Sequence, residues 1–228
     1  MKSLLVAVNI LIVLLFISGC KSRETVEMTD ILKPEDNYEL GSMYLDDGDF
    51  ERAIGQFILA IAKKKDYVEA YGGLATAYFL RGNAYCLKKD YEQCTNDHHS
   101  AMRTYLQALK MKKDFEYGYY GIGRILFVRW QLEKNPKWAQ EAIKYLETAY
   151  KLNNKRVMTS YYLGLCYLAI GRLESAKIHL DEYLKKSPNA LNAHLVKQFL
   201  DEIETKTAQD KYSKILEELE KEYMPSQQ

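Results

Sequence analysis

Cysteine and histidine side chains that could bind zinc or form a disulfide lie close together between Cys86 and His99. Cys94 and His98 are four residues apart, so on a helix they share one face and could contribute to a zinc site. A disulfide between Cys86 and Cys94 needs Cα atoms within about 7 Å, and a register that puts Cys94 one helical turn further from the connecting turn makes that distance marginal. The third interpretation is that these thiols, like Cys166, are unlinked core residues. We expect that no metal ion is bound here.

The sequence contains none of the common catalytic signatures. Gly-x-Ser-x-Gly, His-Glu-x-x-His and the phosphate loop ending in Gly-Lys-Ser/Thr are all missing. The segment 118–123 is rich in glycine, but it falls inside a predicted helix, where glycine permits close packing of backbones. We therefore predict a protein that is not an enzyme and that uses no cofactor.

The N-terminal residues have the layout of a secretory leader. Lys2 provides a positive start, residues 4–17 are uncharged and apolar, and small residues precede Cys20. The apolar run is shorter than the roughly 20 residues that a spanning helix needs, and an uncleaved signal anchor is the alternative. The segment Ile-Ser-Gly-Cys at 17–20 resembles the lipobox of bacterial lipoproteins. This resemblance implies that residues 1–19 are a signal peptide and that acyl chains on Cys20 anchor the chain in the lipid bilayer.

The resemblance to lipoproteins also implies a location in the bacterial cell envelope. Lys21 follows the anchor where lipoproteins kept at the inner membrane often carry Asp, which favours the outer membrane and a domain that faces the periplasm. Residues 20–33 are polar and form the expected tether. Fully extended, this tether reaches at most about 45 Å from the membrane.

Charge and composition exclude one class of partner. Without Lys2 the chain has 31 basic and 31 acidic residues, so it lacks the positive charge of a nucleic-acid-binding protein. A hydrophobic content of 47% is enough for a packed core. We therefore expect no nucleic-acid partner.

Four segments of the body share a pattern of small residues at helical spacing. Each segment has three small sites: Gly41, Ala53 and Ala60; Ala75, Ala101 and Ala108; Gly123, Ala142 and Ala149; and Gly164 and Ala176, with Tyr183 in the third place. Steps of three and four residues around these sites predict two helices and a turn in every segment. Small side chains let the two helices of a pair approach closely, and a larger residue beside each site fills the remaining space.

This pattern resembles the tetratricopeptide repeat family over about residues 34–190. The resemblance implies an all-α solenoid of about four helical hairpins within residues 34–189, which we place at 34–67, 68–115, 116–156 and 157–190. The second and third segments have 48 and 41 residues, whereas the family's repeat has 34. We therefore expect both helices of the second hairpin to be longer by about two turns, which would raise a wall along the edge where the inner turns lie.

Residues 190–228 carry two further apolar stripes, which predict a capping pair of helices. The first stripe is Leu191, Leu195, Phe199, Leu200 and Ile203, and the second is Tyr212, Ile215, Leu216, Leu219 and Tyr223. A terminal repeat needs a polar outer face, so a solenoid cap is the favoured interpretation. A partner-binding helix is the alternative.

In the tetratricopeptide family the partner lies on the concave face, which the first helices of the repeats line. The family's usual positions correspond here to Tyr38, Ser42, Leu45, Thr76, Phe79, Tyr117, Tyr120, Arg124, Phe127, Tyr161, Leu165 and Leu168. Aromatic residues and arginine are frequent in interface hot spots, although such side chains also pack between repeats. The chaperone-binding subgroup holds a C-terminal carboxylate with Lys and Asn where this chain has Tyr38 and Ser42, so that activity is not implied.

The resemblance and the anchor together imply a scaffold that holds a protein or an extended peptide during envelope assembly, secretion or appendage biogenesis. The alternative is an accessory protein of a transport system that binds a small hydrophobic ligand. Gly72, Gly73, Gly118 and Gly121 thin the first helices of two repeats, and a pocket of several hundred Å³ between those helices would favour this alternative.

Overall fold

The computed structural model describes residues 32–205, and within this range the chain is all helical, with no strand. The helices are α2 (Pro34–Asp46), α3 (Phe50–Lys63), α4 (Val68–Leu87), α5 (Tyr91–Met111), α6 (Glu116–Glu133), α7 (Pro136–Leu152), α8 (Val157–Ala169), α9 (Leu173–Lys186) and α10 (Ala193–Glu204). The predicted signal peptide, the anchor Cys20 and most of the tether lie outside the described residues. The all-α class is confirmed.

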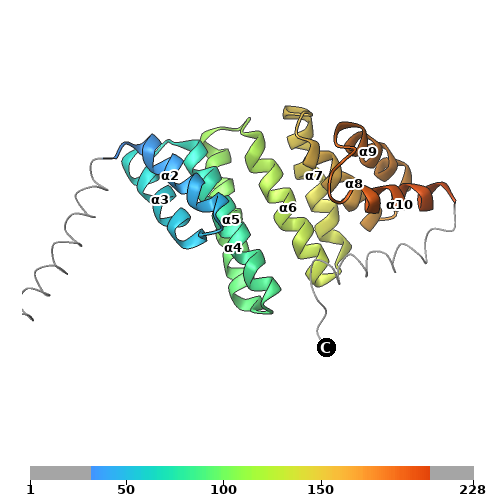
Figure 1. Ribbon diagram of the computed structural model, residues 1–228, viewed down its shortest axis with the longest axis horizontal. Helices are drawn as coiled ribbons and strands as arrows, with labels where there is room; N and C mark the ends of the chain where they lie inside the picture. Colours follow the sequence, from blue (N-terminus) through green and yellow to red (C-terminus); the bar gives the residue numbers. More distant parts are fainter. Residues whose placement is uncertain (1–31, 206–228) are drawn as a thin grey trace, which may run out of the picture.

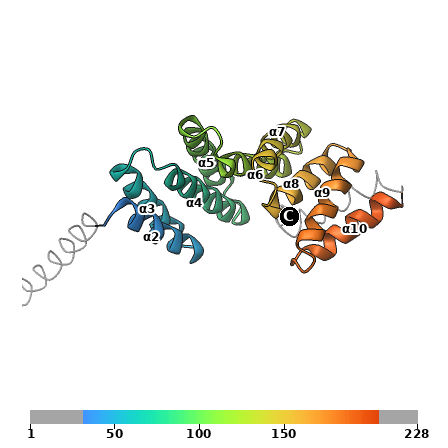
Figure 2. The same ribbon diagram turned by 90° about the horizontal axis from the view of Figure 1, so that it is seen from above.

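The helices form consecutive antiparallel pairs that follow one another in a curved row (Figure 1). The pairs are α2 with α3, α4 with α5, α6 with α7, and α8 with α9, and α10 packs on α9. Seen from above, α5 and α7 lie on the outer side of the curve, and α4, α6 and α8 lie on its inner side (Figure 2). The first helices also contact one another, α2 with α4, α4 with α6, and α6 with α8. They therefore form one continuous inner surface.

Local sequence signals explain where several helices begin. Pro34 and Pro136 occupy the first turn of α2 and α7, where a missing backbone N–H costs nothing. The side chain of Asp49 accepts a hydrogen bond from the backbone N–H of Arg52 (3.1 Å) and so caps α3. Asp90 caps α5 in the same way. These caps fix the direction in which each second helix leaves its turn.

All four turns inside the pairs contain a left-handed residue where the first helix ends, and in the third pair this residue is Lys134, with a φ of 54°. Gly48 has a φ of 75° and Gly171 a φ of 73°, as expected for glycine at this position. The equivalent residue in the long second pair is Lys89, with a φ of 63°. Its backbone N–H donates to the carbonyl oxygen of Cys86 (2.9 Å). Lys89 thus adopts a left-handed backbone conformation, which is unfavourable for residues other than glycine.

Glycines on the first helices receive large side chains from the second helices. A Cβ atom on Gly123 would lie 2.5 Å from Leu146 Cγ, and one on Gly164 would lie 2.6 Å from Leu180 Cγ. The carbonyl oxygen of Ala176 lies 3.4 Å from the same position on Gly164. The sequence predicts that each glycine faces an alanine of the second helix. In the structure the closest neighbour of each of these glycines is instead the leucine one turn beyond that alanine.

The second pair is longer than the first. Helices α4 and α5 have 20 and 21 residues, whereas α2 and α3 have 13 and 14. The third pair is intermediate, since α6 has 18 residues and α7 has 17. The ends of α4 and α5 therefore extend beyond the neighbouring first pair, as Figure 1 shows.

Only the first helix of the expected C-terminal cap lies within the described residues. Helix α10 buries Phe199, Leu200 and Ile203 against the array. Leu191 does not join this stripe, because it lies in the turn before α10 and is 97% exposed. The second predicted stripe lies outside the described residues. Among residues 32–205, none of the helices is both long and apolar enough to span a bilayer.

Candidate partner-binding groove

A cavity of about 320 Å³ opens on the inner side of the curve, between α2, α4 and α6. We call it the groove cavity. Five of the twelve predicted groove residues line it, namely Tyr38, Ser42, Leu45, Thr76 and Tyr117. The carboxylates of Asp46 and Glu69 also line it. The groove cavity thus combines aromatic surface, hydroxyl groups and negative charge, and three successive first helices contribute to its wall.

A hydroxyl network holds the floor of the groove cavity. The hydroxyl of Thr76 donates to the carbonyl oxygen of Gly72 (2.8 Å). Its single proton is then used, so Tyr105 (2.9 Å) and Tyr117 (3.1 Å) donate their hydroxyl protons to Thr76 Oγ1. Burial raises the pKa of Tyr105, which keeps that hydroxyl protonated. Tyr117 thus lines the groove cavity while its hydroxyl is tied to Thr76.

Six of the predicted groove residues are buried and not available to a partner: Phe79, Tyr120, Phe127, Tyr161, Leu165 and Leu168. This corrects the expectation that they line an open surface. The reason is contact between neighbouring first helices. Tyr162, which the family positions did not include, lies 6.1 Å from Tyr120 and 5.4 Å from Phe127, ring centre to ring centre. Its ring covers part of the surface that was assigned to the groove.

Arg124, the remaining predicted residue, is half-buried among aromatic rings. Its guanidinium carbon lies 4.5 Å from the ring centre of Phe79, 5.3 Å from that of Tyr120 and 5.7 Å from that of Tyr162. These distances are within the range of cation–π attraction. The three rings come from α4, α6 and α8, so a single cation contacts three successive repeats.

A second arginine completes this part of the inner surface. Arg156 lies 4.9 Å from the ring centres of both Tyr117 and Tyr120. It donates two hydrogen bonds to the carboxylate of Glu116, at 2.7 and 3.0 Å. The charge of Arg156 is therefore balanced within the protein.

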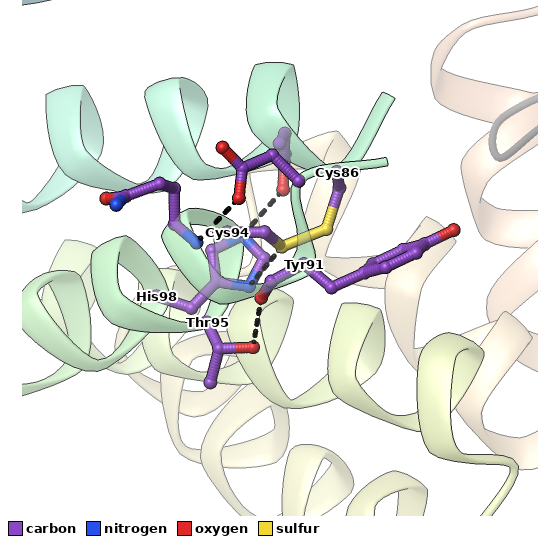
Figure 3. The surroundings of a disulfide bond; sticks show 8 residues. Cys86, Tyr91, Cys94, Thr95 and His98 are labelled. Atoms are coloured by element: carbon purple, nitrogen blue, oxygen red, sulfur yellow. Dashed lines mark hydrogen bonds between the residues drawn. A yellow bond between two sulfur atoms is a disulfide. The ribbon is translucent and has the colours of Figure 1, made fainter. Parts of the chain in front are cut away.

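A disulfide joins the ends of the two long helices (Figure 3). Cys86, near the end of α4, and Cys94, in the first turns of α5, have Cα atoms 5.2 Å apart. The tight turn through Lys89 brings the helices closer than the expected register implied. Both sulfur atoms are engaged, so neither cysteine is free to act as a zinc ligand. Among the described residues no three His, Cys, Asp or Glu side chains are arranged to hold a metal ion.

Polar contacts below the disulfide fix the long pair. His98 lies beside Cys94, with Nδ1 3.8 Å from Sγ, and its Nε2 pairs with Asn83 Oδ1 (2.9 Å). Burial lowers the pKa of His98 to about 4, so the ring is neutral at pH 7. Arg81 of α4 forms a two-fold hydrogen-bonded ion pair with Asp97 of α5, at 2.7 and 2.8 Å. Cys94 and His98 were marked by their spacing, whereas Arg81, Asn83 and Asp97 had no clear signal in the sequence, because these contacts join two different helices.

Family models for the tetratricopeptide repeat match residues 38–85 and 139–198. Together with the stacked helix pairs, these matches decide the family. The chain is a tetratricopeptide repeat protein. Proteins built from these repeats generally act as non-enzymatic scaffolds for protein–protein interaction, and the fold of this chain supports the binding of a protein or peptide partner.

Several solved structures share the fold of this repeat protein. A thermophilic tetratricopeptide repeat protein of Thermus thermophilus is 20% identical with a TM-score of 0.61, over 74% of this chain and 82% of that one. PilF of Pseudomonas aeruginosa is 18% identical with a TM-score of 0.58, over 86% and 77%. MamA of Desulfovibrio magneticus is 16% identical with a TM-score of 0.53, over 83% and 96%. No curated protein matches the chain.

The glycines that suggested a small-ligand pocket in this repeat protein are filled by its own side chains. The ring of Phe115 lies 2.9 Å from where a Cβ of Gly72 would be. The ring of Tyr105 occupies the space that a Cβ of Gly121 would need. Leu109 Cγ lies 3.0 Å from where a Cβ of Gly118 would be. The thinned helices therefore serve packing between repeats.

A second cavity lies beside the turn of the first pair. It has a volume of about 470 Å³ and is bounded by the turn between α2 and α3 and by the end of α4. Glu51, Arg81, Tyr85 and Lys88 line it, and no predicted groove residue does. It arises because α4 of this repeat protein extends past its shorter neighbours.

Proposed function

We propose that this chain is a membrane-anchored scaffold that binds an extended segment of a protein partner along its inner surface. The observation that carries the proposal is the groove cavity, whose wall comes from three successive first helices and whose lining mixes aromatic rings with hydrogen-bonding groups. An extended segment can contact several repeats at once, which suits a surface built by repetition. Aromatic side chains provide large contact areas at low cost in conformational entropy.

The proposed setting is the bacterial cell envelope. The lipobox-like segment at 17–20 supports acylation of Cys20 and attachment to the outer membrane with the repeats facing the periplasm. Equal numbers of basic and acidic residues after the leader support a protein partner over a nucleic acid. The role that fits an anchored scaffold is the docking of a component during envelope assembly, secretion or appendage biogenesis.

Two variants test the two halves of this proposal. Cys20→Ser should abolish labelling by radioactive palmitate and move the chain from the membrane to the soluble fraction of a bacterial host. Unchanged membrane attachment of this variant would refute the lipid anchor.

Ser42→Trp tests the groove, because the larger side chain fills the groove cavity, which Ser42 lines. We expect it to lose the partner that the natural chain captures by affinity purification. Ile58→Trp is the control, since Ile58 is 46% exposed on α3 and is not part of the cavity wall. Equal capture by all three proteins would remove the groove cavity from the proposal.

A further inference from the structure

Arg124 has a buried hydrogen-bond donor that the protein leaves unused. Its Nε atom is inaccessible to solvent and has no hydrogen-bond partner within residues 32–205. None of the ion pairs of the described residues includes Arg124, and its guanidinium lies over the rings of Phe79, Tyr120 and Tyr162. A buried charged donor without a partner is costly, so its retention needs an explanation.

The other arginines of the array show what Arg124 lacks. Arg81 pairs with Asp97 and Arg156 with Glu116, each at 2.7 Å. Arg124 lies against the same ring as Arg156, that of Tyr120, and the single carboxylate of this cluster is already engaged. The cluster therefore carries one uncompensated positive charge on the inner surface. A fixed guanidinium is suited to an anion, and above all to a planar carboxylate that can accept two parallel hydrogen bonds.

We infer that Arg124 is the recognition site for an acidic side chain, Asp or Glu, of the bound partner segment. This inference rests on the proposed function and adds the chemistry of one contact. The rings hold the guanidinium in place and exclude water, so the ligand carboxylate meets a rigid donor at low cost in conformational entropy. Tyr162, which is only partly buried, adds a hydroxyl group that takes part in no hydrogen bond among the described residues and can donate to the same carboxylate.

The position of Arg124 favours a side chain over a chain end. Helix α6 lies in the middle of the array, with α2 and α4 on one side and α8 on the other (Figure 2). The groove cavity is adjacent, since Tyr117 in its wall lies 6.1 Å from Tyr120. A segment that fills the cavity therefore continues past Arg124. Asp46 and Glu69 in the cavity wall repel a carboxylate, so the acidic residue is directed to Arg124 alone.

A library of synthetic twelve-residue peptides, acetylated and amidated to remove both terminal charges, tests the inference on the full chain in detergent. Binders should share Asp or Glu at one position. Replacing that residue by Asn or Gln should weaken binding about tenfold or more. On Arg124→Gln the same replacement should change binding by less than about twofold, because the contact is already lost.

Arg124→Lys keeps the charge without the planar fork and should bind with intermediate affinity, and Arg103→Gln, at an exposed position on α5, should bind like the natural chain. Melting curves show that each variant is folded. Binders without an acidic preference, or an undiminished effect of the replacement on Arg124→Gln, overturn the inference while Ser42→Trp still reports on the groove. Arg124-dependent binding of matched peptides that keep a free C-terminus and lack an acidic side chain also overturns it. If no peptide binding depends on Ser42 or Arg124, the proposed function fails as well.

Discussion

Adding one methyl group at Gly123 tests whether close packing of the helix pairs holds this array together. The Cβ atom of Gly123→Ala would lie 2.5 Å from Cγ and 2.7 Å from Cδ2 of Leu146. Leu146 is fully buried, so it has no free space into which to move. Either α6 and α7 must separate or Leu146 must leave its preferred rotamer.

The expected magnitude follows from two opposing effects. Alanine is favoured over glycine inside a helix by about 1 kcal/mol, whereas overpacking a core costs about 1–3 kcal/mol. We therefore expect Gly123→Ala to lower the free energy of unfolding by about 1 kcal/mol. Gly55 provides a matched control, because it lies inside α3 with no atom within 4 Å of where its Cβ would be. Gly55→Ala should raise the free energy of unfolding by up to about 1 kcal/mol.

Urea denaturation followed by circular dichroism at 222 nm measures both changes, and an unchanged slope shows that the unfolding reaction is the same. A double-mutant cycle with Leu146→Ala locates the cause. In that background Gly123→Ala should no longer be destabilising, because the clashing atoms are gone. If Gly123→Ala stabilises the natural chain as much as Gly55→Ala does, the glycine is not needed for packing and the reasoning is refuted.

Three further predictions concern the long second pair. Replacing Cys86 and Cys94 by Ser should lower the free energy of unfolding by about 2 kcal/mol, as the loss of a short cross-link implies; identical melts with and without reductant would contradict this. Lys89→Gly should raise the free energy of unfolding by about 0.5 kcal/mol, since glycine tolerates a positive φ; a lower melting temperature would contradict it. Because burial lowers the pKa of His98 from 6.5 to about 4, the unfolded chain binds a proton more readily. Stability should therefore fall as the pH falls through that window, by up to about 3 kcal/mol, and fall less steeply in His98→Gln.

The architecture could be predicted because it depends on local periodicity. Small residues such as Gly164 and Ala176 recur at positions that only stacked helix pairs explain, and the all-α repeat fold is confirmed. The left-handed conformation of Lys89 could not be predicted, because lysine has no preference for a positive φ and nothing in the adjacent sequence indicates that the turn requires one. The prediction that Leu191 belongs to the apolar stripe of the cap is wrong. Its spacing fits a helix, but α10 begins two residues later and leaves Leu191 exposed.

The candidate site was predictable only in part. Helical register identifies which side of its own helix a residue occupies, and this was sufficient for Ser42 and Tyr117, which line the groove cavity. Register does not specify how closely the next first helix approaches. Tyr120 and Phe127 are buried for that reason, under a ring from α8. The unpaired donor of Arg124 is likewise a property of packing, visible only once the surrounding rings are placed.

Binding of a partner at the inner surface formed by the first helices is the property on which the proposed function depends most. A photo-crosslinking amino acid placed at Tyr117, in the wall of the groove cavity, and separately at Ile178, which is 66% exposed on α9, tests this in living bacteria. We predict one discrete crosslinked product from position 117 that the Ser42→Trp change abolishes, and none from position 178. The same product from both positions, or a product from 117 that persists when the cavity is filled, would contradict the account.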